Sequence, residues 1–335
     1  MAVTIKDVAK LANVSISTVS RVINDSKPVS EEIKRRVYKV IEETGYVPNP
    51  VARSLVMKKS QLIGVIVPNI ASFYIGEVLN AIEEIAKTYG YDIILCNTYG
   101  EADQEVRYLN LLKSKQVEGI IFLTHRLIDE HRDFFAKNKL PIVMINRDAS
   151  DLNISSVTVN HKLATYELTK YLIENGHKKI NLIRNGESND VFGVDQMEGY
   201  KKAMEEFGLE FKEECIYNGR FKMGTAYDCT QQMIDEDNIP TGIIATTDGM
   251  AVAASNALRD NGYSIPEDVS VVGYYDTKLN SIYRPKLTSI KQPIYDIGAV
   301  ATRVMIKKIK GEETSDNIII LPHSLVVRDS TRKID

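Results

Sequence analysis

Beyond residue 60 the chain alternates short apolar runs with longer amphipathic stretches. The apolar runs, rich in β-branched residues, are 62–67, 93–96, 119–123, 142–145, 157–159, 180–183, 242–245 and 269–273. The stretches with apolar residues at helical spacing are 75–89, 104–115, 163–175, 197–207, 250–261 and 294–310. Such alternation predicts βα units, and hence an α/β fold with parallel sheets covered by helices on both faces. Because the strands are too many for one sheet, we expect two Rossmann-like lobes with a binding crevice between them.

The first sixty residues follow a different pattern. Ile5, Val8 and Ala9 have helical spacing and predict a short amphipathic helix, which the stretch 12–14 ends. A second short helix is expected over 17–23, with Ser15 or Ser17 as its N-cap. Its outer face consists of Ile16, Ser17, Ser20 and Arg21. Two short helices joined by a tight turn predict an all-α helix-turn-helix domain, whose second helix enters the major groove of DNA.

A third helix and a short hinge are expected next. Ser30 is the predicted N-cap of the third helix, and Gly45 ends it. Asn49 can cap a further helix that begins at Pro50. A helix of roughly seven residues is too short to be stable alone in water, so we expect it to fold only in a DNA-bound dimer. Leu55 would then wedge between base pairs in the minor groove; the alternative is an ordinary interdomain linker.

Charge is distributed unevenly along the chain. Residues 1–60 hold 11 Lys+Arg against 6 Asp+Glu, a net charge of +5, whereas the rest of the chain carries −8 of the total of −3. A basic N-terminal segment on an otherwise acidic chain favours binding of the DNA backbone by that segment, because cations that neutralise phosphates release counterions.

The sequence lacks the motifs of the common enzyme classes. It has no GxGxxG after a strand, no GxxxxGK[ST], no GxSxG and no HExxH. The three cysteines share no CxxC spacing, so structural thiols are expected; they are Cys96, Cys215 and Cys229. We therefore expect no enzymatic activity, no metal site and no obligatory cofactor.

The sequence also lacks a run of about 18 apolar residues that would span a bilayer. The N-terminal residues do not resemble a secretory signal. A cytoplasmic protein with no membrane partner is the resulting expectation.

Four runs together resemble the LacI/GalR family of repressors almost position by position: 4–9, 14–24, 45–49 and 51–55. The resemblance implies that bases are read by Ile16, Ser17 and Arg21, that phosphates are contacted by Thr4, Ser15, Thr18 and Asn24, and that Ala52 and Leu55, after Asn49, lie in the minor groove. Each hydroxyl has an alternative role as a helix cap. The family core is similar in architecture to periplasmic sugar-binding proteins.

The expected domains follow from these patterns. They are a helix-turn-helix domain at 1–48, a hinge at 49–60, an N-terminal core lobe at 61–160 plus 291–322, and a C-terminal core lobe at 161–290 plus 323–335.

The residues expected in the effector cleft depart from the family pattern. The resemblance implies an arginine before the helix 197–207 and an aspartate after Gly273 and its aromatic neighbour, but this chain has Gln196 and Tyr275. Asp276 lies next to Tyr275, and Asp248 is retained. A carboxylate can accept hydrogen bonds from two sugar hydroxyls at once and a phenol cannot, so an ordinary sugar site is not expected.

The predicted helix 294–310 offers another place for a signal. Asp296, Val300, Arg303 and Lys307 are spaced to share one face. Two cations four residues apart suit a phosphate, beside an apolar patch of Ala299 and Val300. The alternative is a solvated helix face.

A closer resemblance, to the catabolite-control members of the family in Gram-positive bacteria, covers nearly the whole chain. It rests on this helix together with Glu84, Tyr89, and the runs 91–95, 284–289 and 321–323. It implies a corepressor, the phosphocarrier protein HPr phosphorylated on a serine, whose phosphate is received by Arg303 and Lys307. Asp296 would pair with a basic side chain of HPr, and the surrounding contacts would be Tyr89, Tyr295, Ala299 and Val300. Phosphosugars would be at most auxiliary ligands.

Three functions are compared on this basis. The favoured hypothesis is a dimeric regulator of carbon catabolite repression that binds a pseudo-palindromic operator with phosphorylated HPr. The first alternative is a LacI-family repressor that responds to a small sugar or sugar phosphate. A solute-binding protein or sugar enzyme is the third, which the basic N-terminal segment and the missing export signal disfavour.

Overall fold

The structure is a computed structural model that describes residues 3–24, 27–46, 60–185, 191–220, 222–313 and 317–334. The chain forms two compact units, Met1–Ser60 and Gln61–Asp335. None of the described helices is long and apolar enough to cross a membrane.

The N-terminal unit contains helices α1 (Ile5–Leu11), α2 (Ile16–Asn24) and α3 (Glu31–Thr44) around a small aliphatic core. The hydroxyl and backbone N–H of Thr4 both donate to Asp7, which fixes the start of α1. The N–H of Thr18 donates to Ser15 Oγ at 3.1 Å, so α2 begins one residue earlier than predicted and Ser15, rather than Ser17, is its cap. Gly45 ends α3 in the left-handed region, as the pattern predicts.

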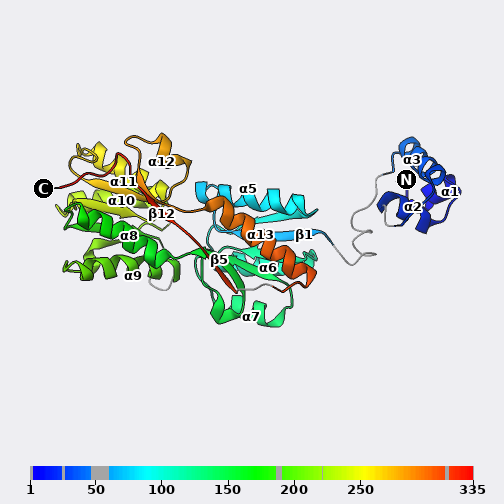
Figure 1. The fold of residues 1–335 in the computed structure, drawn as a ribbon, viewed down its shortest axis with the longest axis horizontal. Helices are drawn as coiled ribbons and strands as arrows, with labels where there is room; N and C mark the ends of the chain where they lie inside the picture. The colour runs from blue at the N-terminus through cyan, green and yellow to red at the C-terminus, as the bar shows by residue number, and fades with distance from the viewer. Residues whose placement is uncertain are drawn as a thin grey trace. The chain divides into compact units, whose positions relative to one another are not determined.

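The larger unit contains two six-stranded sheets among its described residues (Figure 1). The strand order of the first is β11 (Ile318–Leu321), β5 (Ser155–Val159), β4 (Ile142–Ile145), β3 (Gly119–Phe122), β1 (Leu62–Val67) and β2 (Asp92–Asn97), all parallel. The order of the second is β12 (Ser324–Val326), β10 (Thr288–Lys291), β9 (Ser270–Tyr275), β8 (Gly242–Ala245), β6 (Ile180–Arg184) and β7 (Ile216–Asn218). Only β12 pairs antiparallel among these described strands. Two parallel-dominated lobes confirm the predicted fold class.

Helices flank both sheets. Those of the first lobe are α5 (Phe73–Thr88), α6 (Ala102–Ser114) and α7 (Asp129–Lys137), which follow its strands, and α13 (Ile294–Lys310), which follows β10 of the second sheet but packs on the first. Those that follow second-lobe strands or lead into them are α8 (His161–Glu174), α9 (Val191–Glu206), α10 (Met223–Asp235), α11 (Asp248–Asp260) and α12 (Lys278–Ile282), and short 3₁₀ turns lie at η1 (Ser150–Leu152) and η2 (Glu213–Cys215). In the first lobe α5 and α13 pack side by side against one face of the sheet, and α6 and α7 cover the other (Figure 1).

The chain passes between the sheets three times. It leaves the first sheet after β5, returns after β10 to form α13 and β11, and leaves again before β12. Because the carboxyl ends of parallel strands meet at one edge of a sheet, the loops after β1, β3 and β4 face those before α10 and α11. This arrangement forms a cleft between the lobes.

Candidate DNA-reading, cleft and docking sites

The start of α2 presents small polar groups around one aliphatic side chain. Ser15, Ser17 and Arg21 are exposed, and Ile16 is 45% exposed although it is apolar. Ser15 Oγ lies 2.8 Å from both Ser17 Oγ and Thr18 Oγ1, so the hydroxyls form a local network. An exposed aliphatic group at the helix N-terminus and an arginine in the last turn suit a thymine methyl group and a guanine edge in the major groove.

Of the other residues expected to contact DNA, the structure describes only some. Thr4 is exposed, and its hydroxyl donates to Asp7 at 2.7 Å, which lowers the pKa of that carboxyl. Asn24 closes α2, but its side chain is outside the described part of the structure. Asn49, Ala52 and Leu55 lie outside the described residues.

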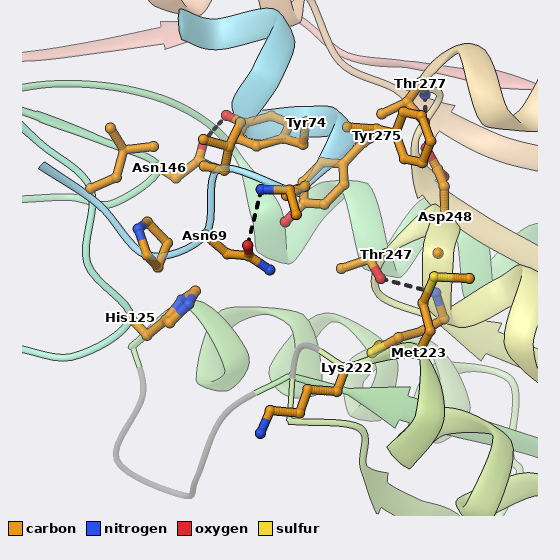
Figure 2. Close-up of a pocket in the computed structure, with 18 of the residues that line it drawn as sticks. Asn69, Tyr74, His125, Asn146, Lys222, Met223, Thr247, Asp248, Tyr275 and Thr277 are labelled. Atoms are coloured by element: carbon orange, nitrogen blue, oxygen red, sulfur yellow. Dashed lines mark hydrogen bonds between the residues drawn. The ribbon is translucent and has the colours of Figure 1, made fainter. Parts of the chain in front are cut away.

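The cleft between the lobes contains a cavity of about 380 Å³ (Figure 2). Its polar lining includes Asn69, His125 and Asn146 of the first lobe and Lys222, Thr247 and Asp248 of the second. Burial lowers the pKa of His125 to about 4, so its ring is neutral near pH 7.

Two tyrosines meet across this cleft. Tyr74, near the start of α5, stacks on Tyr275, at the end of β9, with ring centroids 4.4 Å apart and planes at 29°. Figure 2 shows the two rings side by side at one end of the cavity. Tyr74 was not among the residues predicted for the cleft.

The acidic residues expected in the cleft are already bonded inside the protein. Asp248 accepts hydrogen bonds from the backbone N–H groups of Tyr274 and Thr277 at 3.0 and 2.7 Å, and from Asn280 at 2.9 Å. Burial raises the pKa of Asp248 to about 6 despite these donors. Asp276 forms a bidentate pair with Arg328, at 2.6 and 3.0 Å. Both carboxylates are therefore largely occupied by bonds within the protein, although Asp248 still lines the cavity.

Gln196 is not placed where the sequence suggested. It was expected just before a helix at 197–207, but α9 begins at Val191, so Gln196 lies inside the helix. Its side chain is fully buried near the Tyr274 hydroxyl and does not line the described part of the cavity. The prediction that it faces the cleft is wrong, because the helix starts earlier.

Helices α5 and α13 together form an outer surface, here called the docking surface, made of Glu84, Tyr89, Tyr295, Asp296, Val300, Arg303 and Lys307. All are exposed except Val300, which is half-buried. A hydrogen bond to the Glu84 carboxylate raises the pKa of Tyr295, so the two helices are linked across this surface. No described acidic residue forms an ion pair with Arg303 or Lys307. Two unpaired cations one helical turn apart are available to an anion.

Two details of the docking surface differ from expectation. Ala299 is 1% exposed and packs in the core, so it does not offer the predicted apolar contact. Lys310 was not predicted here, yet its Nζ lies 5.4 Å from the centre of the Tyr89 ring. Its spacing of three residues from Lys307 would have revealed it as a third cation.

A buried acid and imidazole lie in the first lobe, next to Thr124 of the cavity lining. Glu105 Oε2 is 3.3 Å from His131 Nε2, and the Thr124 hydroxyl donates to the same oxygen at 2.8 Å. Burial raises the pKa of Glu105 to about 8 and lowers that of His131 to about 4. Among the described residues no cluster of His, Cys, Asp or Glu has the arrangement of a metal site.

Comparison with known proteins covers both units. Residues 4–49 match the family described as bacterial regulatory proteins, lacI family, and residues 60–328 match periplasmic binding proteins and the sugar binding domain of the LacI family. The HTH-type transcriptional regulator RegA of Clostridium saccharobutylicum is 38% identical over 99% of this chain and 100% of its own length. Catabolite control protein A of Priestia megaterium is 37% identical with the same coverage. The lac repressor dimer bound to operator and the anti-inducer ONPF is 28% identical, with a TM-score of 0.89 over 99% of this chain and 100% of that one.

Proposed function

Because this chain belongs to the LacI family of DNA-binding transcriptional regulators, we propose that it acts in carbon catabolite control with serine-phosphorylated HPr as its corepressor. It binds a pseudo-palindromic operator as a dimer, and the phosphoprotein on the docking surface raises its affinity for that operator. The chain resembles catabolite control protein A over its whole length, which favours this branch of the family.

The pair Arg303 and Lys307 is the observation that carries the proposal. Both cations are exposed, four residues apart on α13, and unpaired among the described residues. A phosphoserine brings close to two negative charges and three acceptor oxygens, which two free cations can neutralise through charge-assisted hydrogen bonds. Neither cation has an acidic residue at i±4 on its own helix, unlike Lys137, which pairs with Asp133 on α7.

The rest of the docking surface supports a protein partner rather than a free phosphate. Tyr89 and Tyr295 are exposed and Val300 is half-buried on the docking surface, and aromatic groups are common anchors in interfaces. Asp296 adds a carboxylate for a basic side chain of the partner. Ala299 is left out of the proposed contacts because it is buried.

Self-association is supported by apolar side chains at the ends of two first-lobe strands. Ile70 and Tyr99 are 50% and 78% exposed, and the Ile70 N–H donates to Asn97 Oδ1, so these loops lie together. Leu95, on the neighbouring edge strand β2, is also exposed. Exposed apolar side chains at a sheet edge are consistent with a surface that another chain covers, and a two-fold dimer would also match an operator with two half-sites.

On DNA we propose the contacts expected from the sequence, with Ile16, Ser17 and Arg21 at base edges and Leu55 in the minor groove. Leu55→Ala should then weaken binding to a specific operator clearly more than binding to random DNA. Equal losses on both DNAs would contradict the minor-groove role.

Direct binding tests the corepressor. Isothermal titration of the full chain with HPr phosphorylated on serine should show saturable binding, and unphosphorylated HPr should bind at least tenfold more weakly. Arg303→Ala should lose most of this difference, whereas Lys113→Ala, an exposed cation on α6, should retain it. Equal binding of both forms of HPr would reject the proposal.

A second candidate is control by a small sugar or sugar phosphate. The matched family description includes a sugar binding domain, and the cleft cavity is large enough for one sugar ring. The bonds of Asp248 to Thr277 and of Asp276 to Arg328 count against it, because they occupy carboxylate oxygens that a sugar would use. Titration with a panel of sugars and sugar phosphates, followed by operator binding, separates the two candidates.

A further inference from the structure

We propose that Tyr74 and Tyr275 form a clasp that holds the two lobes of the core together when the cleft contains no small molecule. The rings come from different lobes and stack at a centroid distance of 4.4 Å. Both are nearly inaccessible to solvent, because each covers the other and the cavity wall. The clasp makes closed lobes the resting state of the core, independently of any corepressor.

The backbone at Tyr275 is unusual for a bulky residue. Tyr275 and Asp276 have φ of 106° and 58°, in the region that favours glycine. An aromatic residue in this conformation is strained, and such strain persists only where the surroundings hold it. Strained residues concentrate at ligand clamps and switches, so the conformation of Tyr275 points to a role beyond packing.

Two side chains hold the strained backbone of Tyr275 and Asp276 in place. Asp248 accepts from the N–H of Tyr274 on one side and from the N–H of Thr277 on the other, so one carboxylate spans the two residues. Arg328 then fixes Asp276 through both carboxylate oxygens. With the backbone held at these points, the ring of Tyr275 projects into the cleft (Figure 2), and it also meets the Tyr274 ring of its own lobe edge-on, with ring centroids 5.5 Å apart.

The partner ring is held equally firmly in the first lobe. The Tyr74 hydroxyl donates to Asn146 Oδ1 at 2.7 Å, and the N–H of Asn146 donates to Val157 O at 3.0 Å. Burial raises the pKa of Tyr74, so its hydroxyl remains a neutral donor. Two rigidly mounted rings gain from stacking only when the lobes are close, which makes the pair sensitive to the lobe separation.

The clasp also affects what enters the cleft. The Tyr275 ring covers the face of Tyr74 on which a flat ligand would stack. Such a ligand must displace the Tyr275 ring, which is held in the same protein and so competes at a high effective concentration. Solutes without a flat face meet only the remaining cavity near Asn69, His125 and Lys222.

Distances between spin labels on the two lobes test the clasp. Labels at Asp103→Cys on α6 and Asp228→Cys on α10, in a full-length chain with Cys215→Ser and Cys229→Ser, report the width of the cleft. Both label positions are exposed, and the remaining Cys96 is buried. Tyr275→Gly removes the ring and relaxes the backbone, Tyr74→Ala removes the other ring, and Tyr275→Phe keeps the stack.

Tyr275→Gly and Tyr74→Ala should each raise the population of long distances relative to short ones by about three- to tenfold, because an aromatic pair contributes that factor to an equilibrium. Tyr275→Phe should keep the wild-type distribution. Unchanged distances in folded Tyr275→Gly and Tyr74→Ala, or opening by Tyr275→Phe as large as that by Tyr275→Gly, would overturn the clasp. Because two independent ring deletions are used, loss of folding in one leaves the other as the test.

Discussion

Gly298 of α13 lies so close to Val78 of α5 that a Cβ built on Gly298 would come within 2.5 Å of the Val78 carbonyl oxygen. The two helices therefore approach through bare backbone at this point. Their spacing sets the distance between Glu84 and Tyr89 on α5 and the cations on α13, which together make the docking surface.

Gly298→Ala should separate these helices. We expect the unfolding free energy to fall by about 1–3 kcal/mol, because an added methyl group is forced against fixed backbone. Binding of serine-phosphorylated HPr should weaken more than operator binding by the unliganded protein. Gly76→Ala on α5 is the matched control, since its Cβ would meet nothing within 4 Å; a control loss as large as that of Gly298→Ala would contradict the role of helix spacing.

Stability should depend on pH through Glu105. Its pKa is raised to about 8 by burial, so between about pH 4.5 and 8 the folded protein holds a proton that the unfolded chain has lost. The contribution of protonated Glu105 to the free energy of unfolding is therefore full below about pH 4.5. It falls as the pH rises from there and is gone above about pH 8. His131, whose pKa is lowered to about 4, acts in the opposite sense between about pH 4 and 6.5.

Glu105→Gln isolates this effect. The Ile128 N–H donates to His131 Nδ1, which leaves the proton of the neutral ring on Nε2, facing Glu105 Oε2. A glutamine can accept from His131 and Thr124 as the neutral acid does. The thermal midpoint of the variant minus that of the wild type should therefore increase between pH 6 and pH 9. Exposed Glu101→Gln should not, and parallel pH curves for Glu105→Gln and wild type would contradict the buried neutral acid.

Removing only one partner of the Arg328–Asp276 ion pair should lower the unfolding free energy strongly. Asp276 keeps only 8% of its side chain exposed, so Arg328→Ala leaves a buried, unpaired carboxylate and should cost about 3–5 kcal/mol in unfolding free energy. Asp276→Asn combined with Arg328→Ala should recover part of that loss. Additive losses in chemical unfolding would show that the two side chains do not act together.

Ser15 should contribute to stability as a helix cap. Ser15→Ala removes the acceptor for the Thr18 N–H and should destabilise the N-terminal unit by about 1 kcal/mol. Ser17→Ala retains that bond and should change stability much less. Comparing the two variants by thermal unfolding and by operator binding separates the capping role of Ser15 from a contact to phosphate.

The sequence predicts the larger elements well. The helix 294–310 was expected with the bounds of α13, because its apolar periodicity is long, Pro293 precedes it and Gly311 ends it in the left-handed conformation. In contrast, α10 was missed: its buried side chains are Ala226, Thr230 and Met233, of which only the last is large and apolar. The three-residue strands β7 and β12 are too short to show a period.

The sites are predictable only as far as local spacing reaches. Arg303 and Lys307 can be placed on one face from their separation alone. The burial of Ala299 depends on how closely α5 approaches, which spacing on α13 does not reveal. The contact of Tyr74 with Tyr275 joins distant parts of the chain across two lobes, so it arises from the closed fold and not from any sequence pattern.

Operator affinity with and without serine-phosphorylated HPr tests the central claim most directly. For the wild type the phosphoprotein should tighten operator binding by about tenfold or more, within the usual range of coupling between two sites. Arg303→Ala should bind the operator normally when alone and lose most of that gain. An operator affinity that phosphorylated HPr leaves unchanged in the wild type would contradict the account.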